Sequence, residues 1–262
     1  MPAATPPNYH EVLAHLAAKQ LTPSPAWLSN LLAAQRPTTP LAALQKTAVF
    51  RLLASDITTS LCATPTGTGT GTGTSTGAGQ TPSVFPPDIH NAEIAPRRLK
   101  GPIAVQVLDV EDVGKSRWAQ VEAIEALERG EGTRGRKIVR IVDEADGGPP
   151  PPENGSRPGN GAAAAVAAAA AGAGPHKLLL QDCAGVRVYA FELGPVPGVG
   201  VAMNIGTKML LRDVEVARGL VLLKPASVVL LGGKIEALHV QWRDGRKEAL
   251  MRAVQSERSD GD

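Results

Sequence analysis

The sequence predicts an α+β protein in which a small helical bundle is followed by a five-stranded β-barrel. Apolar side chains recur at helical spacing through residues 8–61. Five short apolar runs, separated by Gly, Pro and charged residues, lie between residues 103 and 231 and have the length of strands. After Gly233 the apolar spacing becomes helical again, so we expect a C-terminal helix to follow the barrel.

Residues 8–61 are expected to form three short helices. Val12 and Leu16 lie one turn apart in the first, Pro25 opens the second, and Pro40 precedes the third. The apolar residues of the second and third helices are Trp27, Leu28, Leu31, Leu32, Leu41, Leu44, Ala48, Leu52 and Leu53. Because none of these helices can bury an apolar face alone, they should pack together or dock on the barrel that comes after them.

Two tracts of low complexity interrupt the chain, at residues 64–82 and 147–174. The first is rich in Gly and Thr, the second in Pro, Gly and Ala. Such tracts have no apolar surface whose burial could offset the entropy of ordering them, so both are expected to be flexible. Residues 62–96 are therefore interpreted as a linker.

The barrel domain is expected over residues 97–254, with 255–262 as a tail. Its strands are predicted near 103–113, 177–183, 186–193, 207–217 and 219–231. Gly206, Gly219 and Pro225 would turn its corners. Closure of a small sheet removes the edges that it could not otherwise protect, so an OB-fold barrel is the expected architecture.

A large insertion, residues 114–176, separates the first two strands. Ser116 is a plausible helix N-cap, and apolar residues from Trp118 to Leu127 recur every three positions. Residues 136–142, RKIVRIV, form a basic and apolar run that could be an extra strand. Trp118 either anchors an interface with a partner or packs back on its own barrel.

The residues with reactive side chains form no catalytic pattern. Gly114-Lys115-Ser116 resembles the end of a phosphate-binding loop, but the position of that motif's first Gly is Asp109. The five His are scattered over expected helices and loops, and the two Cys lack paired spacing. Cys183, in a predicted hairpin near His176, is interpreted as a structural thiol. We therefore expect no enzyme, catalytic residue, cofactor, metal or small-molecule substrate.

Charge and hydropathy limit the classes of partner. Lys and Arg number 27 and Asp and Glu 25, for a net charge of +2, which permits contact with DNA without implying it. No apolar run approaches the roughly 20 residues of a membrane span, and the N-terminus has no signal pattern. The expected protein is soluble and intracellular, without membrane contact.

A weak DNA-contacting surface is a second possibility for the barrel. Tyr189 and Phe191 lie two residues apart on one strand and could stack on bases, although packing in the barrel interior is the other interpretation. The basic residues that could follow a phosphate backbone are Lys177, Arg187, Lys208, Arg212, Arg218 and Lys224. Only weak or indirect DNA binding is expected from so few aromatic residues.

Several segments resemble one known family. They are PAWLSNLL from Pro25, AVFRLLASDI from Ala48, IAVQVLDVEDVG from Ile103, KLLLQDCAGVRVYAFEL from Lys177, and GTKMLLRDVEVARGLVLLKPASVVLLGGKIEAL from Gly206. Together they are similar to the RecQ-mediated genome instability protein 1 family, in the short form found in fungi. The last segment, which ends the barrel, is the most specific.

This resemblance implies a non-enzymatic nuclear scaffold that binds topoisomerase III and a RecQ-type helicase. The family's complex decatenates DNA and dissolves double Holliday junctions in repair, replication and recombination. The helices and barrel would bind the topoisomerase, and the insertion would reach its gate. The expected partner contacts are Trp118, Val121, Lys137, Ile138 and Val139, and the possible DNA contacts are Tyr189, Phe191, Arg187 and Arg212. The alternative is an autonomous module that binds single-stranded DNA.

Overall fold

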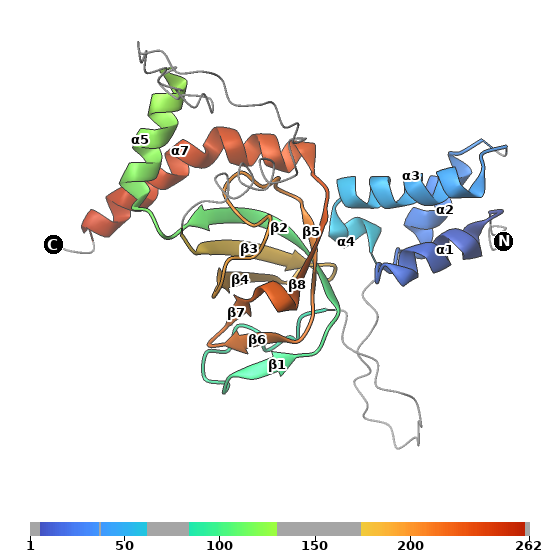
Figure 1. The fold of residues 1–262 in the computed structure, drawn as a ribbon, viewed down its shortest axis with the longest axis horizontal. Coiled ribbons are helices and arrows are strands. Elements are labelled where there is room, and N and C mark those ends of the chain that lie inside the picture. The colour runs from blue at the N-terminus through green and yellow to red at the C-terminus, as the bar shows by residue number, and fades with distance from the viewer. Residues whose placement is uncertain (1–5, 37, 62–83, 130–173, 260–262) are drawn as a thin grey trace, which may run out of the picture. The chain divides into compact units, whose positions relative to one another are not determined.

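The computed structural model describes residues 6–36, 38–61, 84–129 and 174–259 (Figure 1). The chain divides into two compact units. The first comprises residues 1–114 and 171–245, and the second comprises residues 115–170 and 246–262. The predicted strand at 136–142 lies outside the described residues.

The N-terminal helices form where the apolar spacing predicts them. They are α1 (Tyr9–Ala18), α2 (Pro25–Ala33), α3 (Leu41–Ala54) and a short fourth helix, α4 (Ile57–Ser60). Ser24 caps α2, since its Oγ accepts a hydrogen bond from the N–H of Trp27 over 3.2 Å. Asp56 caps α4 in the same way, with 2.8 Å from the N–H of Thr58 to its Oδ1. The core of these helices is built from Val12, Leu16, Leu28, Leu32, Leu44, Ala48 and Leu52.

The described strands form one curled sheet (Figure 1). They are β1 (Arg97–Leu99), β2 (Ile103–Asp112), β3 (His176–Asp182), β4 (Arg187–Glu192), β5 (Lys208–Leu211), β6 (Val214–Ala217), β7 (Leu220–Leu223) and β8 (Val228–Gly232). Their order is β1-β6-β7-β4-β3-β2-β5-β8. All pairs are antiparallel except β4 with β7, which are parallel.

Breaks divide the five predicted runs into more strand segments than the sequence predicts. Asp213 has a left-handed φ of 47° and separates β5 from β6, and a 3-10 turn at Pro225–Ser227 separates β7 from β8. The segment β1 precedes the first predicted strand. When β1/β2, β5/β6 and β7/β8 are each followed as one bent strand, the pairing passes from β2 through β3, β4, β7 and β6 back to β1. The described sheet is therefore strongly curled, as an OB-fold requires.

The region just before the barrel is not a linker throughout. Residues 62–83 lie outside the described residues, but Phe85 and Ile89 are buried in the barrel core. The N–H of Phe85 also donates to Oδ2 of Asp182 over 2.8 Å. Residues 84–96 therefore belong to the domain, because burial of these two apolar side chains stabilises it. The Gly/Thr tract before them has little apolar surface that burial could remove from water.

The C-terminal helix α7 (Glu236–Ser259) extends into the predicted tail. In the first unit, Nε1 of its Trp242 donates to Oδ1 of Asp109 on β2 over 2.6 Å. In the second unit, α5 (Arg117–Glu128) and the later part of α7 are joined by ion pairs. Lys247 lies 3.2 Å from Glu125 and 2.8 Å from Glu128.

The helices α1 to α4 dock on the outer surface of the barrel. Their core includes Ala104 from β2, Leu210 from β5 and Cys183, which follows β3. Gly233 approaches the end of α3 so closely that a Cβ there would lie 2.4 Å from the carbonyl oxygen of Leu53. Helices and barrel are thus continuous through packed side chains, which is one of the two arrangements expected from the sequence.

Candidate partner-binding surface

Trp118 lies exposed near the start of α5, within the insertion. The helix begins as predicted, because Oγ of Ser116 accepts a hydrogen bond from the N–H of Ala119 over 3.1 Å. The indole is 52% exposed, and its Nε1 donates to Oε1 of Glu122 over 2.8 Å. Both interpretations of Trp118 that the sequence left open stay predictions, and its half-exposed indole is the feature that a partner contact would use.

One side of α5 is exposed and largely apolar. Ala119, Ala123 and Leu127 follow each other there at four-residue spacing, and all are exposed. Trp118 lies on another side of the helix, because the nine positions from it to Leu127 make about two and a half turns. Val121 is only 2% exposed, unlike Trp118, and its partner contact stays a prediction. Lys137, Ile138 and Val139 lie outside the described residues, and their partner contacts stay predictions.

The outer side of β4 carries the expected DNA-contacting residues. Val188 and Ala190 are buried while Arg187 and Tyr189 are exposed, which confirms the predicted alternation. Tyr189 is 47% exposed, so packing in the barrel interior is excluded for its ring. Nζ of Lys177 lies 4.4 Å from the centre of that ring, and Phe191 is half-buried.

Arg212 and Lys208 do not join Tyr189 in a basic track. The guanidinium of Arg212 donates to Oε1 of Gln20, just beyond α1. Lys208 is fully buried, and its Nζ donates to the carbonyl oxygen of Gly206 over 2.8 Å. Burial lowers the pKa of Lys208 to about 8, although nearby Asp56 acts in the opposite direction. Expecting Lys208 to contact phosphates was therefore wrong.

His176 and Cys183 have structural positions. His176, expected on the surface or in a loop, is buried, and its Nδ1 lies 2.7 Å from Oε2 of Glu192. Cys183, interpreted as a structural thiol, is buried. Within the described ranges, His, Cys, Asp and Glu form no group of three or more that could hold a metal ion. No helix in the described part of the chain is long and apolar enough to cross a membrane.

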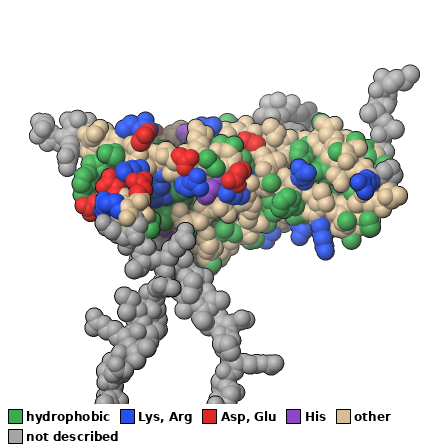
Figure 2. Space-filling view, turned by 90° about the horizontal axis from the view of Figure 1, so that it is seen from above, with side chains coloured by type: hydrophobic (Ala, Val, Ile, Leu, Met, Phe, Trp, Pro, Cys, Tyr) green, Lys and Arg blue, Asp and Glu red, His purple; other side chains and the backbone are tan. Residues whose placement is uncertain are grey.

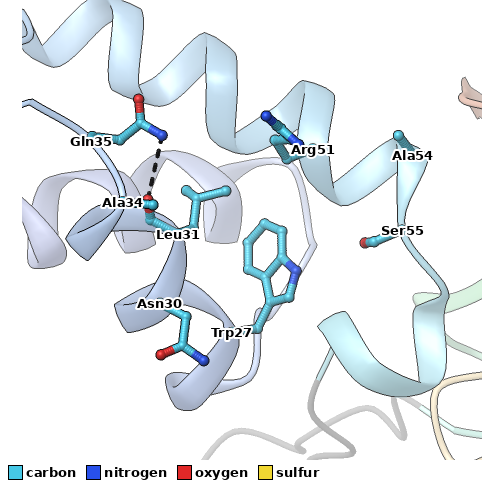
Figure 3. Close-up of a pocket in the computed structure, with 8 residues that line it drawn as sticks. All are labelled: Trp27, Asn30, Leu31, Ala34, Gln35, Arg51, Ala54 and Ser55. Carbon is cyan, nitrogen blue, oxygen red and sulfur yellow. Dashed lines mark hydrogen bonds between the residues drawn. The ribbon is translucent and has the colours of Figure 1, made fainter.

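A hollow between α2 and α3 was missed by sequence reasoning (Figure 3). It measures about 430 Å³ and has Trp27, Leu31, Ala34 and Ala54 as its apolar lining. Arg51 of α3 contributes a charge to its wall. Trp27 and Leu31 lie at i and i+4 on α2, and this pair was the available signal, but both residues were expected to serve helix packing alone.

Comparison with known proteins agrees with this architecture. Residues 85–246 match the family model "RMI1, N-terminal OB-fold domain", and residues 16–60 match "RMI1, N-terminal helical domain". The chain belongs to the RMI1 family. The resemblance stated from the sequence is thus confirmed, and so is the OB-fold, since the matched RMI1 domain is one.

Two curated members of the RMI1 family are similar to the chain, and both are named RecQ-mediated genome instability protein 1. The protein from Schizosaccharomyces pombe is 27% identical over 139 residues, which are 53% of this chain and 58% of that protein. The protein from Xenopus laevis is 39% identical over 67 residues, which are 25% of this chain and 12% of that protein. The chain thus spans less than two thirds of either relative.

Proposed function

We propose that this chain is a non-catalytic nuclear subunit of a complex between topoisomerase III and a RecQ-type helicase. It would bind the topoisomerase and promote decatenation and the dissolution of double Holliday junctions during repair, replication and recombination. Membership of the RMI1 family supports this proposal, and its relatives are named for RecQ-mediated genome instability.

The exposed indole of Trp118 is the observation that carries the proposal. A half-exposed Trp leaves apolar surface in water that burial against a partner would remove. Buried aromatic anchors account for a large share of the binding energy at protein interfaces. Trp118 lies in the insertion between β2 and β3, where the family resemblance expects the topoisomerase contact.

The barrel and the docked helices would supply the rigid part of the contact. Their shared burial of Ala104, Cys183 and Leu210 holds them as one platform. A partner that binds one conformation of the topoisomerase more tightly than another shifts the balance between them. In this way binding alone would bias the opening of the topoisomerase gate, without chemistry in this chain.

A binding assay with purified topoisomerase III tests the proposal. The whole chain is compared with Trp118→Ala, with the matched control Leu193→Ala, and with a deletion of residues 115–173. Leu193 is 50% exposed and lies outside the insertion. The deletion is feasible because a Cβ on Gly114 would lie 2.6 Å from Cα of Gly174, so the two ends are already adjacent.

We expect Trp118→Ala to weaken binding by about 2 kcal/mol and Leu193→Ala by less than about 0.5 kcal/mol. The deletion should remove the stimulation of decatenation. If the intact chain does not bind topoisomerase III, the proposal is lost. If the deletion variant binds and stimulates fully, the barrel and helices act without the insertion.

Single-stranded DNA binding is the second candidate function, favoured by the exposed ring of Tyr189. Lys177 and Arg187 flank this ring with positive charge, as in surfaces that stack bases and follow phosphates. Fluorescence anisotropy with a single-stranded oligonucleotide tests it. Tyr189→Ala should cost about 1–3 kcal/mol while Tyr189→Phe, which keeps the stacking face, should bind normally. Equal binding by both variants would exclude this surface.

A further inference from the structure

The hollow between α2 and α3 has the dimensions of a binding groove. Its volume of about 430 Å³ falls within the ~300–1,000 Å³ that is usual for ligand sites. Small side chains leave it unfilled at one end, where Ala54 and Ser55, at the end of α3, lie opposite Trp27 on α2 (Figure 3). The helices are held together elsewhere, through the buried Leu28 and Leu32.

The apolar lining suits an apolar anchor residue. Trp27 and Leu31 are partly buried, so each keeps surface that an incoming Leu or Phe side chain could cover. Their four-residue spacing places them one helical turn apart along the groove. Filling such a space removes apolar surface from water and restores van der Waals contacts.

The charges around the groove are positive. Neither α2 nor α3 contains Asp or Glu, whereas Lys46 and Arg51 lie on α3 and Arg36 follows α2. Figure 2 shows Lys and Arg, and no acidic side chain, at the right-hand end formed by these helices. Asp56, which follows α3, is occupied by hydrogen bonds from Thr58 and Gln106.

Arg51 is the charged residue within the groove itself. Its guanidinium forms no hydrogen bond or ion pair with any other residue in the described part of the chain, although Figure 3 places it beside Trp27 and Leu31. A carboxylate that paired with it at the edge of an apolar site would gain a charge-assisted hydrogen bond. The groove therefore combines an apolar anchor site with one unused cation.

We propose that the groove between α2 and α3 binds a short acidic peptide segment of a partner protein through a Leu or Phe anchor. The anchor would fill the space beside Trp27 and Leu31, and a neighbouring Asp or Glu would pair with Arg51. Nucleic acid fits less well, because a phosphate backbone needs a row of cations and Arg51 alone lines the groove. This inference does not depend on binding to topoisomerase III.

Fluorescence anisotropy with the full chain and labelled synthetic peptides tests this inference. The first peptide carries Leu and Phe at i and i+4 among Glu and Asp residues. A second has both anchors changed to Ala, and a third has its acids changed to Gln. The first should bind saturably, the other two more weakly by at least about fivefold, and salt should weaken the first.

Substitutions in the chain test whether the peptide binds in the groove. Ala54→Phe fills the groove and Arg51→Ala removes its cation, so each should weaken the first peptide by at least about fivefold. Lys46→Ala is the matched control, because it removes the same charge from an exposed position of α3 outside the lining. It should change affinity less than about twofold. Circular dichroism checks that Ala54→Phe remains folded.

Four results would overturn the inference. The first is the absence of saturable binding by the acidic peptide. The second is equal affinity of this peptide for the unmodified chain and for its Ala54→Phe and Arg51→Ala variants. The third is tighter binding of a single-stranded oligonucleotide at this groove. The fourth is self-association that Ala54→Phe abolishes in analytical ultracentrifugation, since the occupant would then be a second copy.

Discussion

The backbone N–H of Ile57 donates a buried hydrogen bond to Oε1 of Gln106 over 3.0 Å. It joins the first residue of α4 to the middle of β2. The amide nitrogen of Gln106 donates in turn to Gln181 over 3.0 Å and to Asp56 over 3.2 Å. A polar cluster thus lies within the contact between helices and barrel, where one glutamine of β2 satisfies three groups, two at the start of α4 and one on β3.

Gln106→Leu should lower the free energy of unfolding by about 2 kcal/mol. The substitution keeps the approximate volume but leaves the buried N–H of Ile57 without its acceptor. Urea denaturation measures the change. Gln241→Leu, at an exposed position of α7, is the control and should change stability by less than about 0.5 kcal/mol. Equal effects would mean that this hydrogen bond contributes little.

Lys208→Met should change how stability depends on pH. The pKa of Lys208 is lowered by burial from 10.5 to about 8, so between these values the unfolded chain binds a proton more readily than the folded one. Stability of the unmodified chain should therefore rise with pH across this window, by about 3 kcal/mol. The Met variant lacks this rise and should be the more stable protein at neutral pH.

Urea midpoints measured across the same pH window check the Lys208 prediction. Lys19→Met, at an exposed position, serves as the control because it should leave the pH dependence unchanged. Parallel pH profiles for Lys208→Met and the unmodified chain would show that the amine of Lys208 keeps its ordinary pKa in the fold, as a hydrated ammonium would.

Gly233→Ala should be more damaging than Gly232→Ala, although both residues have left-handed φ angles, 99° and 83°. Both substitutions incur backbone strain of about 1 kcal/mol. Only at position 233 would the new Cβ meet another group, the carbonyl oxygen of Leu53 at 2.4 Å, whereas nothing lies within 4 Å at position 232. The additional loss of stability in Gly233→Ala should appear as faster proteolysis of the N-terminal helices. Equal proteolysis rates for the two variants would contradict the close contact at Leu53.

Asp182→Ala should destabilise the chain by about 3 kcal/mol. This carboxylate accepts hydrogen bonds from the N–H groups of Phe85, Ala184 and Val186, at 2.8 to 3.0 Å. Burial raises the pKa of Asp182, while these hydrogen bonds act against that shift. Asp182→Asn keeps one oxygen acceptor and should lower stability less than Asp182→Ala, as measured by thermal unfolding. If Asp182→Asn lowers stability more, the added amide group disturbs the site more than the missing acceptors do.

The local elements could be predicted because their causes are local. Apolar spacing identified α1, α2, α3 and α7, and Ser116 caps α5 because its hydroxyl reaches an N–H three residues away. Alternation along β4 correctly placed Val188 and Ala190 inside, since side chains of a strand point to opposite faces. Resemblance in the same segments also identified the RMI1 family.

The site could be predicted only in part. Trp118 and Tyr189 are exposed as a partner-binding or DNA-binding role requires, but Val121 is buried and Arg212 is paired with Gln20. The burial of Val121 and the pairing of Arg212 depend on which distant residues the fold brings next to them. The groove at Trp27 depends on small side chains about twenty-five residues further along the chain, which spacing within α2 does not reveal.

The sequence by itself therefore determined the elements, their inward faces and the family, because side-chain periodicity follows from the geometry of one helix or strand. Only the tertiary structure decided that Lys208 is buried beside Asp56, since that requires α4 to fold over a strand more than 140 residues away. Burial depends on long-range packing, and a lysine on an isolated strand carries no sign of it.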